Sequence, residues 1–214
     1  MKTIADTPPA SRTAILDSAD ELFALQGFAA TSVKQIGERA DANPALIYYY
    51  FGDKLGLYRA VFQRIGATLR DSVRAQGNPE AIGSQVERLV AAQVALINAH
   101  PRAVMLIARE LLDHGAEHAQ PMIHGLAAEL FRPTVGAIEA ARASGTVRPD
   151  VRAEFALLST ISQMFYFALA KPLVRVLLQR GPDYPTDAEV TAFGQHAAQF
   201  ALAGMGVTTP GSRP

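Results

Sequence analysis

Hydrophobic residues recur at spacings of three and four through most of the chain, and this spacing predicts helices. In the first such stretch, residues 11–26, apolar side chains are expected to form an inner face and polar ones to face water. The inner face comprises Ile15, Leu16, Ala19, Leu22 and Phe23, and the outer face Asp17, Asp20 and Glu21. Gly27 is predicted to end this helix. The alternation typical of strands is scarce, so the predicted fold class is all-α.

Two short helical patterns follow, at residues 32–40 and 44–50, and a tight turn separates them. Ser32 begins a capping-box pattern, which satisfies backbone N–H groups at the start of a helix. Asn43 can cap the second short helix, and Pro44 suits its first position because an N–H there has no intrahelical partner. Two short helices joined in this way, with a longer helix on either side, predict a helix-turn-helix that presents its second helix to the major groove of DNA.

The rest of the chain is predicted to form longer helices. Their expected ranges are 54–76, 80–99, 102–114, 120–144, 151–180 and 187–204. Pro133 and Pro172 fall inside two of these ranges and are expected to kink or divide them, since proline lacks the N–H of the helical hydrogen bond. The apolar stretch Phe155–Ala170 is shorter than the roughly 20 residues that cross a membrane, so it is predicted to be a buried helix.

The composition limits the cellular compartments and the reactions that can be expected of this chain. The chain has no cysteine, which excludes disulfides and thiolate nucleophiles, and its first ten residues lack the apolar stretch of a secretory signal. These features predict a cytoplasmic protein with no membrane contact, and no cofactor is expected. The formal net charge is zero, so charge alone indicates neither nucleic acid nor any other partner.

The segment Ile47–Lys54, which reads Ile-Tyr-Tyr-Tyr-Phe-Gly-Asp-Lys, follows the segment Thr31–Ile36, which reads Thr-Ser-Val-Lys-Gln-Ile. In content and separation the two segments resemble the TetR family of repressors, and the resemblance extends over Arg12–Phe62. The stretch Arg109-Glu110-Leu111 is similar to the CecR-type branch of that family. The resemblance implies a ligand-responsive transcriptional regulator, expected to be a repressor and not an enzyme. Such a protein binds a palindromic double-stranded DNA operator as a homodimer and is released by a small-molecule effector.

The resemblance also implies which residues meet DNA. Phosphates are expected to be contacted by Thr31 or Ser32, Tyr49 and Lys54, and bases to be read by Asn43, Pro44, Ala45 and Tyr48. The alternative is that the tyrosines of this helix merely pack. Asp41 stands in the turn where the family usually has glycine, and Met1–Ala75 carries nine Lys and Arg against eight Asp and Glu. Phosphate binding is therefore expected to depend on hydroxyls, helix N-termini and a few cations.

Four segments are predicted: a flexible arm at residues 1–10, a DNA-binding domain at 11–57, an effector-binding and dimerisation domain at 58–205 and a disordered tail at 206–214. The predicted effector pocket is lined by Met105, Arg109, His114, Phe131, Gln163 and Met164. The predicted dimer interface comprises Phe155, Leu158, Ser162, Phe165, Phe193, Ala197, Phe200 and Ala201. Ordinary packing or exposure is the alternative for the pocket residues, and completion of the monomer core is the alternative for the interface residues.

Two of these residues admit sharper hypotheses. Arg109 can anchor an acidic or phenolic effector, or can form a surface ion pair with Glu110 or Asp113. The string His114-Gly115-Ala116-Glu117-His118 matches the pattern of inverted zinc peptidases. Because Gly115 and Pro121 indicate a helix break there and no third ligand is evident, no metal site is predicted. A metal-dependent hydrolase, a regulatory metal site that includes His124, and a helical adaptor without DNA binding remain as alternatives.

Overall fold

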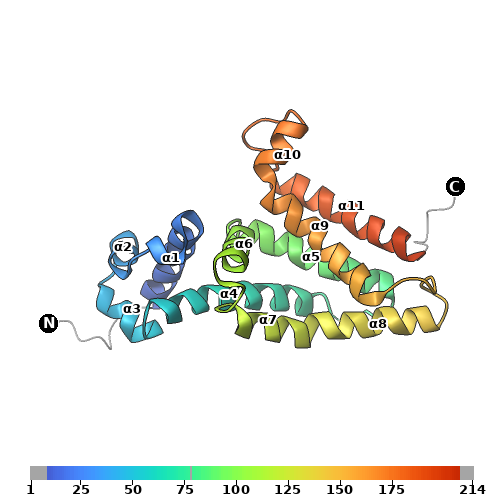
Figure 1. The fold of residues 1–214 in the computed structure, drawn as a ribbon, viewed down its shortest axis with the longest axis horizontal. Coiled ribbons are helices and arrows are strands. Elements are labelled where there is room, and N and C mark those ends of the chain that lie inside the picture. Colours follow the sequence, from blue (N-terminus) through green and yellow to red (C-terminus); the bar gives the residue numbers. More distant parts are fainter. Residues whose placement is uncertain (1–8, 78, 208–214) are drawn as a thin grey trace. The chain divides into compact units, whose positions relative to one another are not determined.

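The computed structural model describes residues 9–77 and 79–207, and every regular element in those ranges is a helix. The predicted all-α fold class is confirmed (Figure 1). The elements are α1 (Pro9–Ala30), α2 (Val33–Arg39), α3 (Pro44–Phe51), α4 (Lys54–Ala75), α5 (Ile82–Ala99), α6 (Ala103–His114), α7 (Gln120–Leu126), the π-helical turn η2 (Ala127–Phe131), α8 (Arg132–Ala143), α9 (Ala153–Leu169), α10 (Lys171–Leu177) and α11 (Asp187–Met205). Most of the predicted arm and tail lies outside the described residues.

These helices form two compact units. The first, called here the N-terminal unit, comprises the described chain up to Gly66 together with Arg102–Ile123. The second, the C-terminal unit, comprises Ala67–Pro101 and the described chain from His124 onward. The units divide the chain at other points than the predicted domains do. The predicted boundary after residue 57 falls inside α4, and α6 belongs to the N-terminal unit.

Aromatic packing closes the core of the N-terminal unit. The Tyr58 ring meets the rings of Phe23 and Phe62 edge to face, at centroid distances of 4.8 and 4.9 Å. Around them the fully buried side chains include Ile15, Ile36, Ile47, Leu57 and Leu106. These residues come from α1, α2, α3, α4 and α6, so a single core fixes the two short helices against three longer ones.

The first helix differs from its prediction in two details. Gly27, with φ 81°, breaks the helical geometry as predicted, although one further turn follows it to Ala30. Asp20 was expected to face water, and that prediction is wrong. Its side chain is 8% exposed, and Oδ2 lies 3.8 Å from the guanidinium of Arg102. The cation comes from just before α6, about eighty residues away, and no local pattern in α1 indicates it.

The C-terminal unit is a helical body in which α11 packs against α5 and α9, and α8 packs against α9. Its core comprises Ile82, Val86, Leu89, Ile138, Val147, Val151, Ala153, Leu157, Leu202 and Met205. α11 begins with a capping box, in which Thr186 caps the helix and Glu189 bonds back to it. This body is therefore stabilised by one apolar cluster that joins four helices.

Both prolines change the helices that contain them. α9 and α10 meet at a bend of 79° next to Pro172, so the predicted division is confirmed. Pro133 lies at the start of α8, directly after the π-helical turn η2, where it changes the hydrogen-bonding pattern without ending the helix.

The predicted burial of α9 is wrong for one of its faces. Phe155, Leu158 and Tyr166 are 54%, 48% and 57% exposed, because only the opposite face of the helix packs on α5, α8 and α11. Within the described ranges no single helix is long and apolar enough to span a membrane, and two bent helix pairs pass that test on length and composition.

Candidate nucleic-acid interface

α2 and α3 are fixed by the end groups that their sequences predict. The Ser32 hydroxyl accepts the N–H of Gln35 at 3.2 Å, and the Gln35 side chain accepts the Ser32 N–H at 2.8 Å, so the capping box is confirmed. Asn43 Oδ1 accepts the N–H of Ala45 at 2.9 Å, and Pro44 occupies the first helical position. Both helices therefore begin with satisfied N–H groups at an exposed surface.

The turn between the two helices requires an unusual backbone and a close approach. Asp41 adopts φ 48°, the left-handed conformation that the family pattern assigns to glycine. In α2 a Cβ on Gly37 would lie 2.9 Å from the carbonyl oxygen of Ala42 and 3.1 Å from Pro44 Cγ. Gly37 therefore permits the approach of the turn and α3 to α2. Gly37 was not among the predicted residues, although a glycine inside a short helical pattern is a usable sequence signal for close packing.

α3 separates its side chains into a buried and an exposed face. Ile47 is fully buried, whereas Tyr48 and Tyr49 are 56% and 61% exposed. Asn43, Pro44 and Ala45 are exposed as well, at the start of the same helix. The structure thus brings all five predicted residues of α3 and its cap to one open surface.

Thr31 does not belong to that surface, and its predicted contact with phosphate is wrong. The side chain is 1% exposed, its hydroxyl donates to the carbonyl of Gly27 at 2.7 Å, and Gln26 donates to it at 3.2 Å. The hydroxyl thereby satisfies a carbonyl that the break in α1 leaves free. Of the pair predicted from the sequence, Ser32 is the exposed member.

Lys54 has a structural task that the sequence did not show. Its Nζ donates to the carbonyls of Phe28 and Thr31 at 3.0 and 2.9 Å and lies 4.3 Å from the centre of the Phe28 ring. Two of the three ammonium N–H groups are therefore used within the N-terminal unit. The proposed contact with phosphate depends on the third.

Several other cations of this unit are paired with carboxylates. Arg39 binds Glu21, and the hydrogen bond lowers the pKa of that glutamate. Arg64 lies 2.5 Å from Asp17. Lys34, on α2, is the most exposed of the paired cations, with a glutamate 3.8 Å away. This pairing agrees with the nearly balanced charge of the sequence, and it leaves hydroxyls and helix N-termini as the main groups for phosphate.

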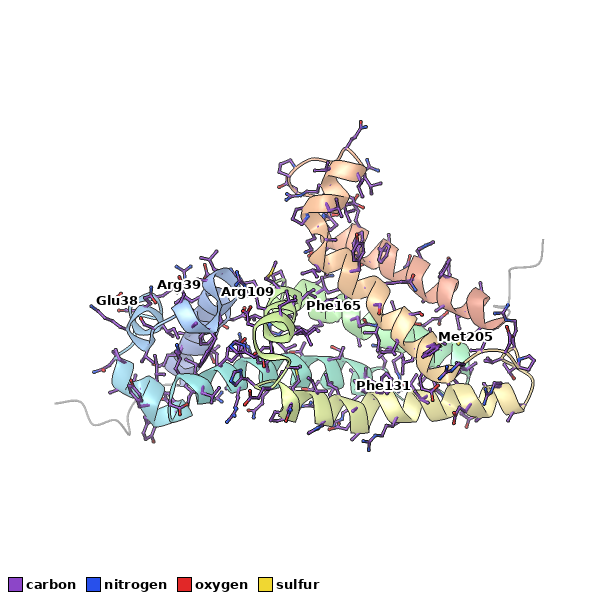
Figure 2. The ribbon with its side chains drawn as sticks, in the orientation of Figure 1. Glu38, Arg39, Arg109, Phe131, Phe165 and Met205 are labelled. Atoms are coloured by element: carbon purple, nitrogen blue, oxygen red, sulfur yellow. The ribbon has the colours of Figure 1, made fainter. Side chains whose placement is uncertain are left out.

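α6 joins the unit through Arg109. Its guanidinium donates to the carbonyls of Ala24 and Leu25 in α1, both at 3.0 Å (Figure 2). These contacts are neither of the two roles predicted for Arg109, an effector anchor or a surface ion pair, because the side chain bonds to backbone carbonyls. The neighbouring Glu110 carboxylate lies 3.0 Å from His114. Two of its five N–H donors are committed to α1, and the role of effector anchor stays a prediction.

The six predicted pocket residues are divided between the two units. Met105, Arg109 and His114 lie in the N-terminal unit, and Phe131, Gln163 and Met164 in the C-terminal unit. Phe131 packs on the apolar core of its unit (Figure 2). Met164 is fully buried beside Gly194 of α11. Gln163 lines a surface groove of 390 Å³ between α9 and α11. Within the C-terminal unit these three residues therefore do not meet at one place.

The predicted dimer residues separate in a similar way. Phe155, Leu158 and Phe200 are 54%, 48% and 63% exposed, and Ser162 is exposed too. Phe193 stacks on Phe167 at a centroid distance of 4.0 Å. The remaining members, Phe165 and Ala201, are partly exposed, whereas Ala197 is fully buried. Ala197 cannot reach a second chain, so its assignment to the interface is corrected.

A capped pair of short helices in a tight turn, with an open α3 surface, defines a helix-turn-helix DNA-binding protein. The comparisons with known proteins identify its family. The model for bacterial regulatory proteins of the tetR family matches residues 15–61, and a tetracyclin repressor-like C-terminal domain matches residues 83–194. The chain belongs to the TetR family and is a ligand-responsive DNA-binding regulator of transcription. The CecR-type branch is not confirmed.

Individual relatives agree with this family. The HTH-type transcriptional repressor NicS of Pseudomonas putida is 30% identical over 165 residues, which cover 73% of this chain and 75% of the relative. A second HTH-type repressor, from Streptomyces coelicolor, is 27% identical over 183 residues, 86% of this chain and 91% of the relative. The crystal structure of a tetR-family regulatory protein from Rhodococcus has a TM-score of 0.70 at 21% identity and covers 95% of this chain and 100% of its own. That last likeness shows the fold alone.

Proposed function

We propose that the chain is a repressor that binds a palindromic operator as a homodimer and leaves it when a small molecule binds. The observation that carries this proposal is the open surface of α3, where two tyrosines that are more than half exposed follow the buried Ile47. Large aromatic side chains are normally buried in a monomer, so their exposure beside a capped helix start indicates a binding surface. As a regulator of genes, the protein would act in the cytoplasm, and we assign it no catalytic role.

The exposed groups divide into two kinds of contact. We assign phosphate contacts to Ser32 and Tyr49, and to the third ammonium N–H of Lys54. Base reading is assigned to Asn43 and Tyr48, with Pro44 and Ala45 beside them. The Asn43 amide keeps its two N–H donors after its oxygen caps α3, and an asparagine amide can pair with adenine in the major groove.

Two variants test this division against a site first defined by selection from random duplexes. Asn43→Ser keeps an oxygen that can cap α3 but removes the amide donors. It is expected to relax preference at one base position, at a cost on the order of 1–3 kcal/mol for the preferred base. Tyr49→Phe is expected to weaken binding to preferred and scrambled duplexes alike, as loss of a phosphate contact should. Unchanged affinity and preference in both variants would remove α3 as the reading helix.

The dimer is assigned to the exposed faces of α9 and α11. Phe155, Leu158 and Phe200 are joined there by Tyr166, which is 57% exposed and is not among the residues predicted from the sequence. A TetR-type regulator needs two heads in fixed register, because the half-sites of a palindrome lie about one turn of DNA or a multiple apart. Covering these four side chains with a second copy would remove them from water and hold that register.

The effector is assigned to the C-terminal unit, where the start of α5 and the second half of α8 line an open groove of 910 Å³. This volume lies within the range of small-molecule sites. α4 continues from the N-terminal into the C-terminal unit without a break, so a ligand that favours one position of α4 can bias the heads.

A thermal-shift screen of small molecules tests this assignment. A true effector must weaken operator binding, and the operator must weaken effector binding by the same factor. Ala140→Phe, which places a large side chain in this groove, is expected to abolish the shift and leave operator affinity intact. A hit that still binds the Ala140→Phe variant would place the effector elsewhere.

A further inference from the structure

The end of α6 brings three metal-binding side chains together. Glu110 and His114 are four residues apart on one face of the helix, and His114 Nδ1 lies 3.0 Å from Glu110 Oε2. Gly115 and Ala116 then adopt φ 57° and 68°, which turns the chain back. His118 Nδ1 thereby lies 3.3 Å from the same carboxylate oxygen.

The distances between the Glu110 carboxylate and the two imidazoles fit a metal site, although the sequence motif alone did not predict one. Tetrahedral zinc has ligand bonds of about 2.0–2.1 Å, which place neighbouring donors roughly 3.3 Å apart. In the described part of the chain each of the three residues offers a donor atom within 4.8 Å of the others. Glu117, the glutamate of the peptidase pattern, is exposed and lies outside this group. The third ligand, which is absent from the motif itself, is Glu110, one helical turn before His114.

Hydrogen bonds fix the orientation of the Glu110 carboxylate, as is typical of a metal ligand. Its side chain is 1% exposed, and its Oε1 accepts the N–H groups of His118 and Ala119 at 2.6 and 3.3 Å. The Tyr58 hydroxyl adds a further hydrogen bond. Such contacts fix a carboxylate's orientation and leave Oε2 to the two imidazoles.

A buried carboxylate also needs a positive partner. The adjacent Arg109 does not supply one, because its guanidinium bonds to carbonyls of α1. A cation bound between the carboxylate and the two imidazoles would supply that compensation. His114 and His118 are 23% and 14% exposed, so a cation can enter from solvent.

We propose that Glu110, His114 and His118 bind one divalent transition-metal ion of the zinc type. Two imidazoles and a carboxylate favour zinc, cobalt or iron(II) over magnesium or calcium, which prefer oxygen ligands alone. Three protein ligands leave a fourth tetrahedral position for water or another small ligand. The bound ion joins the two ends of the turn after α6 and stabilises the unit that carries α3.

The test uses the full-length protein, stripped with a chelator and titrated at pH 7.5 with zinc in competition with a chromophoric indicator. We expect one equivalent per chain, and with cobalt the strong visible absorption of a tetrahedral site. His114→Gln and His118→Gln are expected to weaken zinc binding at least a hundredfold. His196→Gln is the matched control, since it also removes one of the chain's five histidines but lies exposed on α11.

Melting curves supply the second measurement. Zinc is expected to raise the Tm of the unaltered protein and of His196→Gln, and magnesium to raise neither. Glu110→Gln, which keeps an oxygen for the two backbone N–H groups, is expected to lose the zinc shift. The proposal is overturned if zinc binding is absent, or if the His114 and His118 variants bind as tightly as the control. No step uses DNA, so this result is independent of the proposed function.

Discussion

At the scale of single residues, the hydrogen bonds of Lys54 lead to a specific prediction about stability. Its ammonium group bonds to the carbonyls of Phe28 and Thr31, at and just after the end of α1. Hydrogen bonds to a charged group contribute about 1.5–3 kcal/mol, so Lys54→Ala is expected to lower the free energy of unfolding by about 2 kcal/mol. Urea denaturation followed by circular dichroism measures this change.

The control for that measurement is another lysine of the same unit. Lys34→Ala removes a side chain that is 82% exposed and 3.8 Å from its glutamate, so its effect is expected to stay within about 0.5 kcal/mol. Equal stability of the two alanine variants would show that the bonds of Lys54 do not hold the turn.

Tyr58 predicts how stability depends on pH. Burial raises the pKa of its phenol above the usual 10, and the nearby charge of Glu110 acts in the same direction. The folded state therefore holds the proton more tightly than the unfolded state. This stabilisation is complete below about pH 10 and is lost as the pH rises further.

Tyr58→Phe removes the titrating group together with its bond to Glu110. At pH 8 the variant is expected to be less stable than the unaltered protein by about 1.5 kcal/mol. Above pH 10 the difference is expected to shrink, because only the unaltered protein loses stability through this group. Denaturation at pH 8, 10 and 10.5 measures the difference, and one that stays constant across this range would contradict the raised pKa.

Residues differ in how far the sequence could define them. Ser32 and Asn43 were predictable as caps because capping acts over three residues or fewer. Thr31, Lys54 and Arg109 were not. The Thr31 hydroxyl bonds to the carbonyl of Gly27, where the helix breaks, and Lys54 and Arg109 bond to carbonyls more than twenty and more than eighty residues away. Hydrogen-bonding capacity is visible in a sequence, but the partner across a fold is not.

At the scale of elements, Gly37 and Gly136 offer a paired test. Alanine normally stabilises a helix interior relative to glycine by about 1 kcal/mol. Gly136, in α8, has open space around its Cβ position, so Gly136→Ala is expected to stabilise by 0.5 to about 1 kcal/mol. At Gly37 the added Cβ meets the backbone of the turn at 2.9 Å, so Gly37→Ala is expected to destabilise despite its better helix propensity.

Thermal melting of both glycine variants measures whether each substitution raises or lowers the stability. Gly37→Ala should also weaken operator binding, because the turn must shift and α3 with it. A stabilised Gly37→Ala variant would mean that the approach of α2 to α3 is looser than the structure has it.

The bounds of most helices were predicted well, but the helices that each one packs against were not. Periodicity and terminal signals depend on neighbours within a few residues, and they placed α5, α6 and α11 within two residues of their observed bounds. Periodicity cannot say which helix covers an apolar face. The burial of α9 was therefore overestimated, and the place of α6 beside α1 was missed.

At the scale of the whole molecule, the exposed apolar face of α9 and α11 predicts assembly. Phe200→Glu places a charge where a second copy is proposed to pack, and it is expected to give a folded monomer with weakened operator binding. Sedimentation velocity with circular dichroism measures mass and fold together. Gln199→Glu adds the same charge at the next exposed position and is expected to remain dimeric. Dimers in both variants would place the interface elsewhere.

The N-terminal unit is assembled from two segments that the ribosome makes at different times. α1 to α3 are complete once Phe51 has been made, but Arg109 and Glu110 follow only after all of α4 and α5. Until then the carbonyls of Ala24 and Leu25 lack their guanidinium partner, and Leu106 is missing from the core. Contacts between segments so distant form late in folding. The nascent chain is therefore expected to acquire its DNA-binding shape only after α6 has been made, about halfway through translation, so that shorter unfinished polypeptides do not compete with finished dimers for the operator.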